Sequence, residues 1–471
     1  MQKKLLLVVL TIIISIFPTT AFAAPGPNLQ LTASAVVLME QTTGQVLYSR
    51  NAHQRMYPAS ITKMLTALLV YQHLDLDTIV VAGSEMRSVP GGFSTAGHFE
   101  GETLTVYVLL NGLLIPSGND SAMVLAMEVV RALENRRNIP VNEAQIRFSS
   151  LMNEKARSLG AMDSNFQNPF GMHHELHYTT AYDMALIGRA FMENPTLAQI
   201  SAKREYESDS LGGLTHTDAR TRNFTWVNTN LMLPGAAFSH PFVTGGRTGF
   251  TTPAGHCFVG AAYSNGLSLI AVVLYSNEPA RWTDTRVLLD YGFFNYSFRE
   301  IAMGDQLLEI VTIENPQLGD TNTLDIHLSE GHTALLSHAQ YALIERRVIF
   351  DPLFLAEHES ENEGESKTVL RAPIEYQEAV GVVEYRIGND IIFTAQAIAT
   401  RYVGQRSFDS DMDYYMAMIF GNILTRRALP YWFGIFGTLF GIVGISMAVS
   451  ANRRARRQER WNSPEPPRRR R

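Results

Sequence analysis

Along the N-terminal part of the chain, apolar residues follow two patterns, one typical of strands and one typical of helices. Ala33–Met39 is apolar and rich in β-branched residues, and Gly44–Tyr48 continues after a turn, so this part predicts a β-hairpin. The apolar runs Phe258–Ala262 and Leu267–Tyr275 are joined by Asn265-Gly266, a dipeptide typical of a tight hairpin turn. The sequence therefore predicts antiparallel strands near both ends of this region.

Helical spacing of apolar residues dominates between these strands. The predicted helices begin at Ser60 or cover Thr103–Leu114, Ser121–Leu133, Gln145–Leu159, Thr180–Met192 and Arg281–Tyr291. Thr179 or Thr180 suits the N-cap of the fifth helix. A sheet built from both ends of the region, with helices from its middle, predicts an α+β domain with an antiparallel sheet.

From about Glu300 onward the pattern changes to short strands separated by turns. The predicted strands are Leu307–Ile313, Thr323–Leu328, Val348–Phe350, Ala379–Tyr385 and Ile391–Ile398. They predict a small all-β domain. Glu357–Lys367 is charged and lacks a run of apolar residues, so we expect an exposed loop there.

Both ends of the chain predict contact with a membrane. Lys3 and Lys4 precede the apolar stretch Leu5–Phe17, and Ala21–Ala23 offers a small-residue cleavage site, so residues 1–23 are predicted to be a signal peptide. Ala428–Ser450 carries no charge and is long enough to cross a bilayer. Arginines follow it directly, which predicts a cytoplasmic tail by the positive-inside rule.

Charge and cysteine content exclude other classes of protein. The formal charge of −6 includes the arginine-rich tail, so the rest of the chain is more acidic still. We expect no nucleic-acid binding, because phosphate contacts need a basic surface. The single cysteine, Cys257, excludes an intrachain disulfide. It lies in an apolar run, which predicts a buried structural thiol.

Three short motifs in order predict an acyl-transfer site. They are Ser60-Ile61-Thr62-Lys63, Ser117-Gly118-Asn119 and Arg247-Thr248-Gly249. Residues three apart on a helix lie on one face, so a deprotonated lysine amine can activate the serine hydroxyl. Each motif alone has an ordinary interpretation: the serine as an N-cap, Ser-Gly-Asn as a turn and Thr-Gly as part of a hairpin. Their joint order and their contexts favour a site.

These motifs and the sequence around them resemble the low-molecular-mass penicillin-binding proteins, the serine-type D-alanyl-D-alanine carboxypeptidases. The resemblance covers residues 30–400, and the matching segments are Pro58–Ala67, Ile115–Ala122, Asn168–Met172, His177–Asp183, Thr248–Cys257, Asp290–Phe293 and Leu370–Ile374. It implies a penicillin-binding, β-lactamase-like transpeptidase domain over 28–297. A small β-rich domain over 298–405, a membrane-proximal linker over 406–427, a transmembrane helix over 428–450 and a basic tail over 451–471 complete the expected organisation.

The resemblance also implies roles for the residues of the three motifs. Ser60 would be the nucleophile, Lys63 its base, Ser117 a proton relay and Asn119 a holder of substrate and lysine. The backbone N–H groups of Ser60 and Phe250 would form the oxyanion hole, while Arg247, Thr248 and Gly249 would bind the substrate's terminal carboxylate. The implied partners are peptidoglycan stem peptides, β-lactam antibiotics and the membrane, without cofactor or metal. The implied reaction removes the terminal D-alanine of the stem pentapeptide outside the cytoplasm.

Some alternatives stay open at this point. The family usually has lysine at the position of Arg247, which motivates a wall-binding or scaffold protein without turnover. A β-lactamase would need a dedicated deacylating group, for which Glu175 is a candidate. His173, His174 and His177 lie near Glu175 and could suggest a metal, although the family resemblance places them in an ordinary connecting loop.

Overall fold

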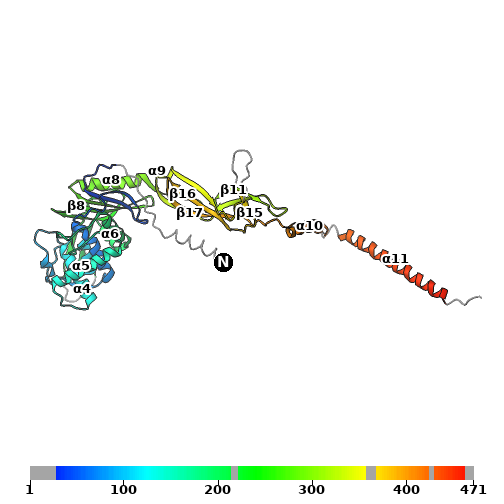
Figure 1. The fold of residues 1–471 in the computed structure, drawn as a ribbon. Helices are drawn as coiled ribbons and strands as arrows, with labels where there is room; N and C mark the ends of the chain where they lie inside the picture. Colours follow the sequence, from blue (N-terminus) through cyan, green and yellow to red (C-terminus); the bar gives the residue numbers. More distant parts are fainter. Residues whose placement is uncertain (1–27, 214–220, 357–367, 424–428, 462–471) are drawn as a thin grey trace, which may run out of the picture. The chain divides into compact units, whose positions relative to one another are not determined.

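The computed structural model describes residues 28–213, 221–356, 368–423 and 429–461 (Figure 1). The expected signal peptide, the Glu357–Lys367 loop and the end of the basic tail therefore lie outside the described residues. The chain divides into two compact units, Met1–Arg299 with Ala334–Leu343, and Glu300–Thr333 with Ile344–Arg471.

The first unit is built on a five-stranded antiparallel sheet in the order β2-β1-β9-β8-β7. The strands are β1 (Ala35–Glu40), β2 (Val46–Arg50), β7 (Val243–Thr251), β8 (Gly255–Ser264) and β9 (Leu267–Ser276). Both predicted hairpins are confirmed, and the turn between β8 and β9 has positive φ at Asn265 and Gly266, as that dipeptide favours. The two ends of the unit meet where β1 pairs with β9.

Helices cover both faces of this sheet, with α8 (Ala280–Asn295) on one face and α6 (Ala181–Glu193) on the other (Figure 1). The side of α6 also holds α2 (Lys63–His73), α3 (Val106–Leu114), α4 (Asn119–Glu134), α5 (Val141–Ser158) and α7 (Pro195–Ala202). All six predicted helices are present, and Thr180 caps α6 by accepting a hydrogen bond from the Asp183 N–H.

Several helix boundaries differ from the predicted ones, by up to four residues at the start of α5 and the end of α8, and at two of them the kind of element also differs. The segment that begins at Ser60 starts with the 3₁₀ turn η1 (Ala59–Thr62) before α2. Thr103–Thr105 is not helical but forms β4, which pairs with β3 (Ile79–Val81) because the two threonines suit an extended strand. The hairpin of β5 (Glu205–Asp209) and β6 (Asn223–Val227) and the turn η2 (Ser84–Ser88) were not predicted.

Alternating side chains of β1 show why the sheet is buried on both faces. Val37 and Met39 belong to the core shared with the helices on the α6 side, whereas Val36 and Leu38 belong to the core under α8. All four side chains are fully buried. The sheet therefore forms a rigid central layer, and the end of β7 carries Arg247–Gly249 toward η1.

The second unit contains a six-stranded sheet in the order β14-β16-β17-β12-β11-β15. Its strands are β11 (Leu307–Glu314), β12 (Thr323–Leu328), β14 (Ile344–Phe350), β15 (Val369–Arg371), β16 (Ala379–Ile387) and β17 (Asp390–Ala399). The five predicted strands are confirmed, and they enclose a separate apolar core. β10 (Tyr296–Ala302) pairs with β13 (His332–Ser337), which the short helix α9 (His338–Tyr341) follows.

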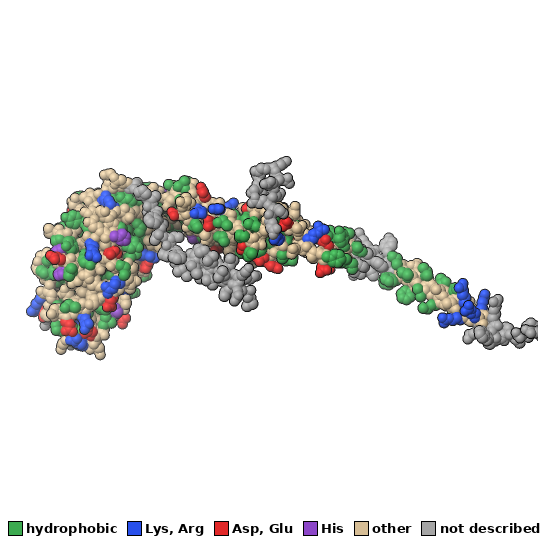
Figure 2. All heavy atoms as spheres, viewed as in Figure 1, with side chains coloured by type: hydrophobic (Ala, Val, Ile, Leu, Met, Phe, Trp, Pro, Cys, Tyr) green, Lys and Arg blue, Asp and Glu red, His purple; other side chains and the backbone are tan. Residues whose placement is uncertain are grey.

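Two helices end the described chain. The expected linker contains α10 (Phe408–Ile423), so this stretch is not simply extended. α11 (Leu429–Trp461) includes Phe433–Arg457, which is long and apolar enough to cross a membrane, with a mean hydropathy of 1.9. Figure 2 shows apolar side chains along this helix and a cluster of arginines near its end.

Candidate active site

The three sequence motifs meet at one cleft of the first unit, with a volume of about 640 Å³. Ser60, Ser117 and Asn119 line it together with Thr248, Gly249 and Phe250, so residues far apart in the sequence share one surface. The rest of the lining comes from three further segments. These are Gly92–Ser94, Phe170–His173 and Thr251–Pro253, with Thr229 and Arg281 beside them.

Close backbone packing fixes the position of Ser60. The preceding residue, Ala59, has φ +49°, a left-handed conformation that is unusual for alanine. Gly171 lies against it, and a Cβ at Gly171 would stand 1.8 Å from the Ala59 carbonyl oxygen. Gly249 lies on the other side, where a Cβ would stand 3.1 Å from the Ser60 nitrogen. The glycine of the third motif is therefore needed because β7 passes so close to the Ser60 backbone.

The Lys63 side chain is fully buried and joins the first two motifs. Its Nζ lies 2.8 Å from Ser60 Oγ, 3.3 Å from Ser117 Oγ and 2.5 Å from Asn119 Oδ1. A fourth contact, of 3.3 Å, reaches the Phe170 carbonyl oxygen. The Lys63 amine thus contacts the hydroxyl groups of Ser60 and Ser117 and the side-chain amide of Asn119, all of which belong to the predicted motifs.

These four contacts fit a neutral amine. The Phe170 carbonyl oxygen and Asn119 Oδ1, with the amide oriented as assigned, can only accept hydrogen bonds. They take the two N–H groups of an uncharged amine, and its lone pair is left for a hydroxyl hydrogen. Of the two hydroxyl oxygens, Ser60 Oγ, at 2.8 Å, is the nearer to Nζ.

The electrostatic surroundings favour the same protonation state. Burial lowers the pKa of Lys63 well below its ordinary value, and the positive charge of Arg247 lowers it further, while Asp120 opposes them. The prediction that burial and Arg247 depress the pKa of Lys63 is therefore confirmed. A buried lysine of this kind can accept a proton at neutral pH.

The second motif is held by the start of α4. Gly118 is the N-cap residue and Asn119 the first residue of the helix, which aims the Asn119 side chain at Lys63. Ser117 has φ +69°, again unusual for a residue with a side chain. Such strain persists only where surrounding contacts impose it, and it occurs often at functional sites.

Arg247 lies behind the cleft and not in its wall. Its side chain is buried, and Nη1 donates to the Leu114 carbonyl oxygen at 3.3 Å and to Thr229 Oγ1 at 3.2 Å. Thr229 in turn contacts the hydroxyl of Thr248 at 2.7 Å, which does line the cleft. Within the described chain, Nε and Nη2 of Arg247 have no hydrogen-bond partner. Burial, followed by the charge of Arg281, lowers the pKa of Arg247 to about 9.

Arg281 is a site residue that sequence reasoning missed. It lies in the first turn of α8, lines the cleft, pairs with Glu278 at 2.9 Å and stacks over the Trp282 ring. It carries a permanent positive charge at the surface where substrate would bind. The sequence offers no local motif around it, and only the fold brings the start of α8 to the cleft.

The histidine cluster has a structural explanation. The ring of buried His177 accepts from the Gln167 N–H at Nδ1, so its other nitrogen donates to Thr62 Oγ1, 3.0 Å away. Burial, with smaller effects from His174 and His173, lowers the pKa of His177 to about 3. Both ring nitrogens are thus engaged, and Glu175 is exposed and outside the cleft lining. Within the described residues no group of three side chains suits a metal.

Cys257 is buried, as predicted from its apolar surroundings. Burial raises the pKa of its thiol to about 11, against weaker lowering by a backbone hydrogen bond and by Arg281. A thiol with so little thiolate is a poor nucleophile. The chemistry of the cleft therefore rests on the serines and the lysine.

Comparison with known proteins agrees with this geometry. A family model described as D-alanyl-D-alanine carboxypeptidase matches residues 19–278. The chain is 31% identical to the D-alanyl-D-alanine carboxypeptidase DacF of Bacillus subtilis over 323 residues, which covers 67% of this chain and 77% of that relative. It is 26% identical to DacD of Escherichia coli over 402 residues, with 83% and 92% covered.

Solved structures share the fold. The DacD carboxypeptidase of Francisella tularensis superposes with a TM-score of 0.58 at 22% identity, covering 83% of this chain and 98% of that one. A mutant of a Streptomyces DD-transpeptidase superposes with a TM-score of 0.51 at 29% identity, covering 56% and 99%. Since the family model spans more than half of the chain and the relatives match over most of their length, this chain belongs to the D-alanyl-D-alanine carboxypeptidase family of low-molecular-mass penicillin-binding proteins.

Proposed function

We propose that this protein is a serine carboxypeptidase that removes the terminal D-alanine from peptidoglycan stem pentapeptides. The observation that carries the proposal is the buried Lys63 amine, which contacts Ser60, Ser117 and Asn119 beside an open cleft. Family membership supplies the reaction class. The geometry supplies a way for each step to proceed.

In the first step Ser60 Oγ attacks the carbonyl carbon between the two D-alanines. Its proton passes to Lys63 Nζ, while the carbonyl oxygen takes the negative charge. The backbone N–H groups of Ser60 and Phe250 would stabilise that oxygen as an oxyanion hole. The C–N bond then breaks, and the leaving amine receives a proton through Ser117, whose hydroxyl lies 3.3 Å from Lys63 Nζ.

In the second step water hydrolyses the ester on Ser60. Lys63, neutral again after the first step, takes a proton from the water as the new O–C bond forms, and it returns that proton to Ser60 Oγ as the bond between the acyl carbon and Oγ breaks. Asn119 would hold both the lysine and the substrate amide. The result is a shortened peptide with a new terminal carboxylate, without a cofactor.

Positive charge near the cleft would receive the substrate's terminal carboxylate. The sequence assigned this role to Arg247 with Thr248 and Gly249. Arg247 has two donor groups without partners in the described chain, and it reaches the cleft through Thr229 and Thr248. Arg281 adds a second guanidinium directly in the wall. β-Lactams resemble the acyl-D-alanyl-D-alanine end of the peptide and would acylate Ser60 in the same way.

The membrane anchor would place this site at the cell wall. α11 is suited to span the bilayer, and arginines follow its apolar part. We infer that the tail is cytoplasmic and that the catalytic unit lies outside, with the signal peptide removed. The β-rich unit would act as a spacer between membrane and catalytic unit.

The alternatives have less support. A scaffold without turnover was motivated by Arg247, but this arginine keeps the positive charge that depresses the pKa of Lys63. A β-lactamase would need a group that activates water for rapid deacylation, and Glu175 is exposed outside the cleft. Neither alternative explains the contacts of Lys63 with Ser60, Ser117 and Asn119 better than a carboxypeptidase does.

Mass spectrometry of the penicillin-treated protein tests the proposal. The expected adduct lies on the peptide that contains Ser60, and Ser60→Ala should remove it. A D-alanyl-D-alanine peptide should lose one D-alanine in a parallel incubation. Acylation without peptide hydrolysis would favour the scaffold, and an adduct at another residue would refute the assignment of the nucleophile.

A further inference from the structure

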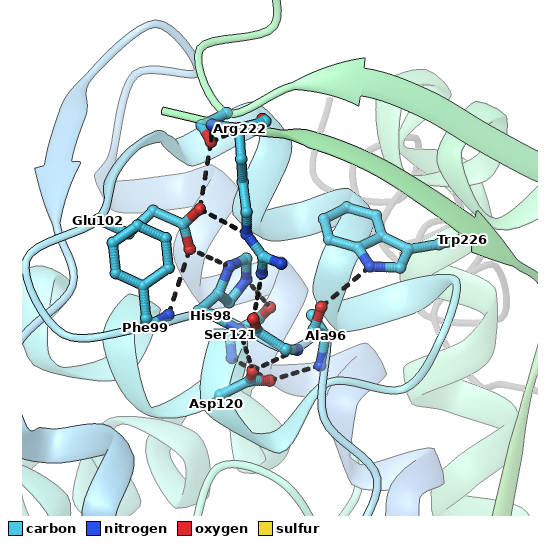
Figure 3. Close-up of polar contacts among 10 residues, drawn as sticks. Ala96, His98, Phe99, Glu102, Asp120, Ser121, Arg222 and Trp226 are labelled. Atoms are coloured by element: carbon cyan, nitrogen blue, oxygen red, sulfur yellow. Dashed lines mark hydrogen bonds and ion pairs between the residues drawn. The ribbon is translucent and has the colours of Figure 1, made fainter. Parts of the chain in front are cut away.

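Asp120, the residue after Asn119, joins the second motif to a neighbouring segment. Its buried carboxylate accepts hydrogen bonds from the backbone N–H groups of Ala96, Gly97 and His98, at 2.8, 2.8 and 2.9 Å (Figure 3). It also accepts from the Ser121 N–H at 3.0 Å. One side chain at the start of α4 therefore holds a whole turn of non-regular backbone.

The same two segments are joined again beside the cleft. The Asn119 N–H donates to the Ser94 carbonyl oxygen at 3.0 Å, and Ser94 Oγ donates to the Ser117 carbonyl oxygen at 2.8 Å. Ser94, Ser117 and Asn119 all line the cleft. A displacement of the segment around Ser94 would therefore move the two residues that contact Lys63.

A buried side-chain network holds the far side of this segment. The His98 side chain is fully buried between two partners, with Nδ1 3.2 Å from Glu102 Oε2 and Nε2 2.9 Å from Ser121 Oγ. Glu102 also accepts a hydrogen bond from Arg222 Nε at 3.0 Å, and Arg222 Nη2 donates one to the Gly97 carbonyl oxygen. Figure 3 shows these side chains converging from separate segments, with Trp226 bonded to the Ala96 carbonyl oxygen.

The ionisation of Glu102 fixes one hydrogen atom of this network. Burial raises the pKa of Glu102, but hydrogen bonds from His98 and Arg222 together with their charges outweigh it, and the net pKa is lowered. An ionised carboxylate can only accept, so Nδ1 of His98 carries its proton. Nε2 shares a hydrogen bond with the Ser121 hydroxyl, which can either donate or accept. Both ring nitrogens of His98 therefore have a hydrogen-bond partner in the chain Ser121–His98–Glu102.

This chain has the order of a Ser-His-Glu triad, but it does not suit a nucleophile. Ser121 is fully buried and is not among the residues that line the cleft in the described chain. A substrate cannot reach its hydroxyl. The arrangement is suited instead to hold α4 and the 94–98 segment in one relative position.

We propose that His98 is a positioning residue of the carboxypeptidase, which keeps Ser117 and Asn119 in register with Lys63 by bridging Glu102 and Ser121. The proposal rests on the proposed function and deepens it. Its physical basis is that acyl transfer needs the reacting groups in near-attack geometry, and small displacements reduce rates strongly. His98 touches neither Lys63 nor the cleft, so its effect is transmitted through Asp120, Ser94 and the start of α4.

The test is a double-mutant cycle in the full-length protein, with fluorescent penicillin as the acylating probe. His98→Ala should reduce the second-order acylation rate by roughly ten- to a hundredfold, because the positions of Ser117 and Asn119 relax. In a Ser117→Ala background and in an Asn119→Ala background the same change should cost less than in the wild type, since one of the two groups that it positions is absent from each. His98→Gln, whose amide can still donate to Glu102, should recover part of the rate.

His240 provides the matched control, because it is a second buried histidine of the same unit that pairs with an acidic residue, Asp290, at 3.2 Å. His240→Gln is expected to lower the melting temperature without changing the acylation rate of the folded protein. Equal acylation by His98→Ala and wild type would overturn the proposal, as would a loss that persists fully in both the Ser117→Ala and the Asn119→Ala backgrounds. If His98→Ala does not fold, the cycle with His98→Gln decides by the same criteria. Failure of wild type to be acylated at Ser60 would instead refute the proposed function, before any His98 variant is compared.

Discussion

Lys63 and Arg247 are two buried basic side chains of one site, and the positive charge of Arg247 lowers the pKa of Lys63 in addition to burial. The arginine that departs from the family's usual lysine therefore preserves one electrostatic effect that a lysine would have there. It holds this position through Leu114 and Thr229 without contacting the Lys63 amine. Two predictions follow from this pair, one for each partner.

Lys63→Arg should abolish general base catalysis while it retains a positive charge. A guanidinium stays protonated, so it cannot take the Ser60 proton, and acylation by penicillin should fall by about 10²-fold or more. Lys155→Arg is the control, because Lys155 bonds Gln72 near the surface and lies outside the cleft. Near-normal acylation of Lys63→Arg would remove Lys63 from the mechanism.

Arg247→Gln should change the pH dependence of acylation. Only the deprotonated Lys63 is active, so the rate rises with pH through the pKa of Lys63. Removing the neighbouring positive charge raises that pKa, and the rising limb of the profile should move to higher pH. Arg247→Lys keeps the charge and should leave the limb close to its wild-type position. If the rising limb of the pH profile does not move in Arg247→Gln, burial alone sets the pKa of Lys63.

The sequence predicted the site's chemistry because its three motifs are local. Ser60 and Lys63 are three residues apart, and the serine and asparagine of the second motif flank a single glycine. Continuous apolar runs also located the strands β8 and β9, which are buried on both faces, and helical periodicity located α6. The start of the catalytic helix was less accurate, because the left-handed φ of Ala59 depends on the close packing of Gly171.

Other features depend on contacts between distant segments. Arg281 reaches the cleft only because α8 packs on β8 and β9 of the sheet, and no residue pattern around it indicates a binding role. The Phe170 carbonyl oxygen, which accepts from Lys63, is a backbone atom and leaves no mark in the sequence. The bridge of His98 between Glu102 and Ser121 likewise joins residues that no periodicity relates.

The buried thiol of Cys257 should be unreactive in the native protein. Burial raises its pKa to about 11, so very little thiolate exists at pH 8, and the side chain is inaccessible to reagent. A maleimide should label the denatured protein with one equivalent and the native protein hardly at all. Rapid native labelling would mean that the strand around Cys257 opens readily.

A protease-protection experiment can test the orientation of the membrane anchor. If α11 spans the bilayer with its arginines inside, protease added to cells with a permeable wall should digest the catalytic unit and spare an epitope tag placed after Arg471. Detergent should expose the tag. Loss of the tag from sealed cells would contradict the positive-inside argument, and moving Arg453, Arg454, Arg456 and Arg457 to the other flank should invert the result.

Peptides with and without a terminal carboxylate should distinguish the role of Arg281 from that of Arg247. A hydrogen bond to a charged group contributes about 1.5–3 kcal/mol, so losing the residue that grips the carboxylate should cost about ten- to a hundredfold in kcat/KM for a peptide with a free carboxylate. The amidated peptide has no such charge and should lose much less. Arg281→Gln tests the guanidinium in the cleft wall, and Arg247→Gln tests the one behind Thr248.

The comparison of free and amidated peptides in both variants assigns the role. If Arg247 takes part through its two unpartnered donor groups, its variant should show the selective loss, and Arg247→Lys should restore most of it. If Arg281 in the cleft wall binds the carboxylate, Arg281→Gln should lower kcat/KM for the free peptide more than for the amidated one. Arg247→Gln should then lower kcat/KM for both peptides equally, through its effect on Lys63. Arg286→Gln is the control, because Arg286 lies on the same helix and bonds the backbone of Phe238 and Ser239 outside the cleft. Equal losses for both peptides in both arginine variants would mean that neither guanidinium binds the carboxylate, and the hydroxyl of Thr248 would then be the remaining group of the third motif to test.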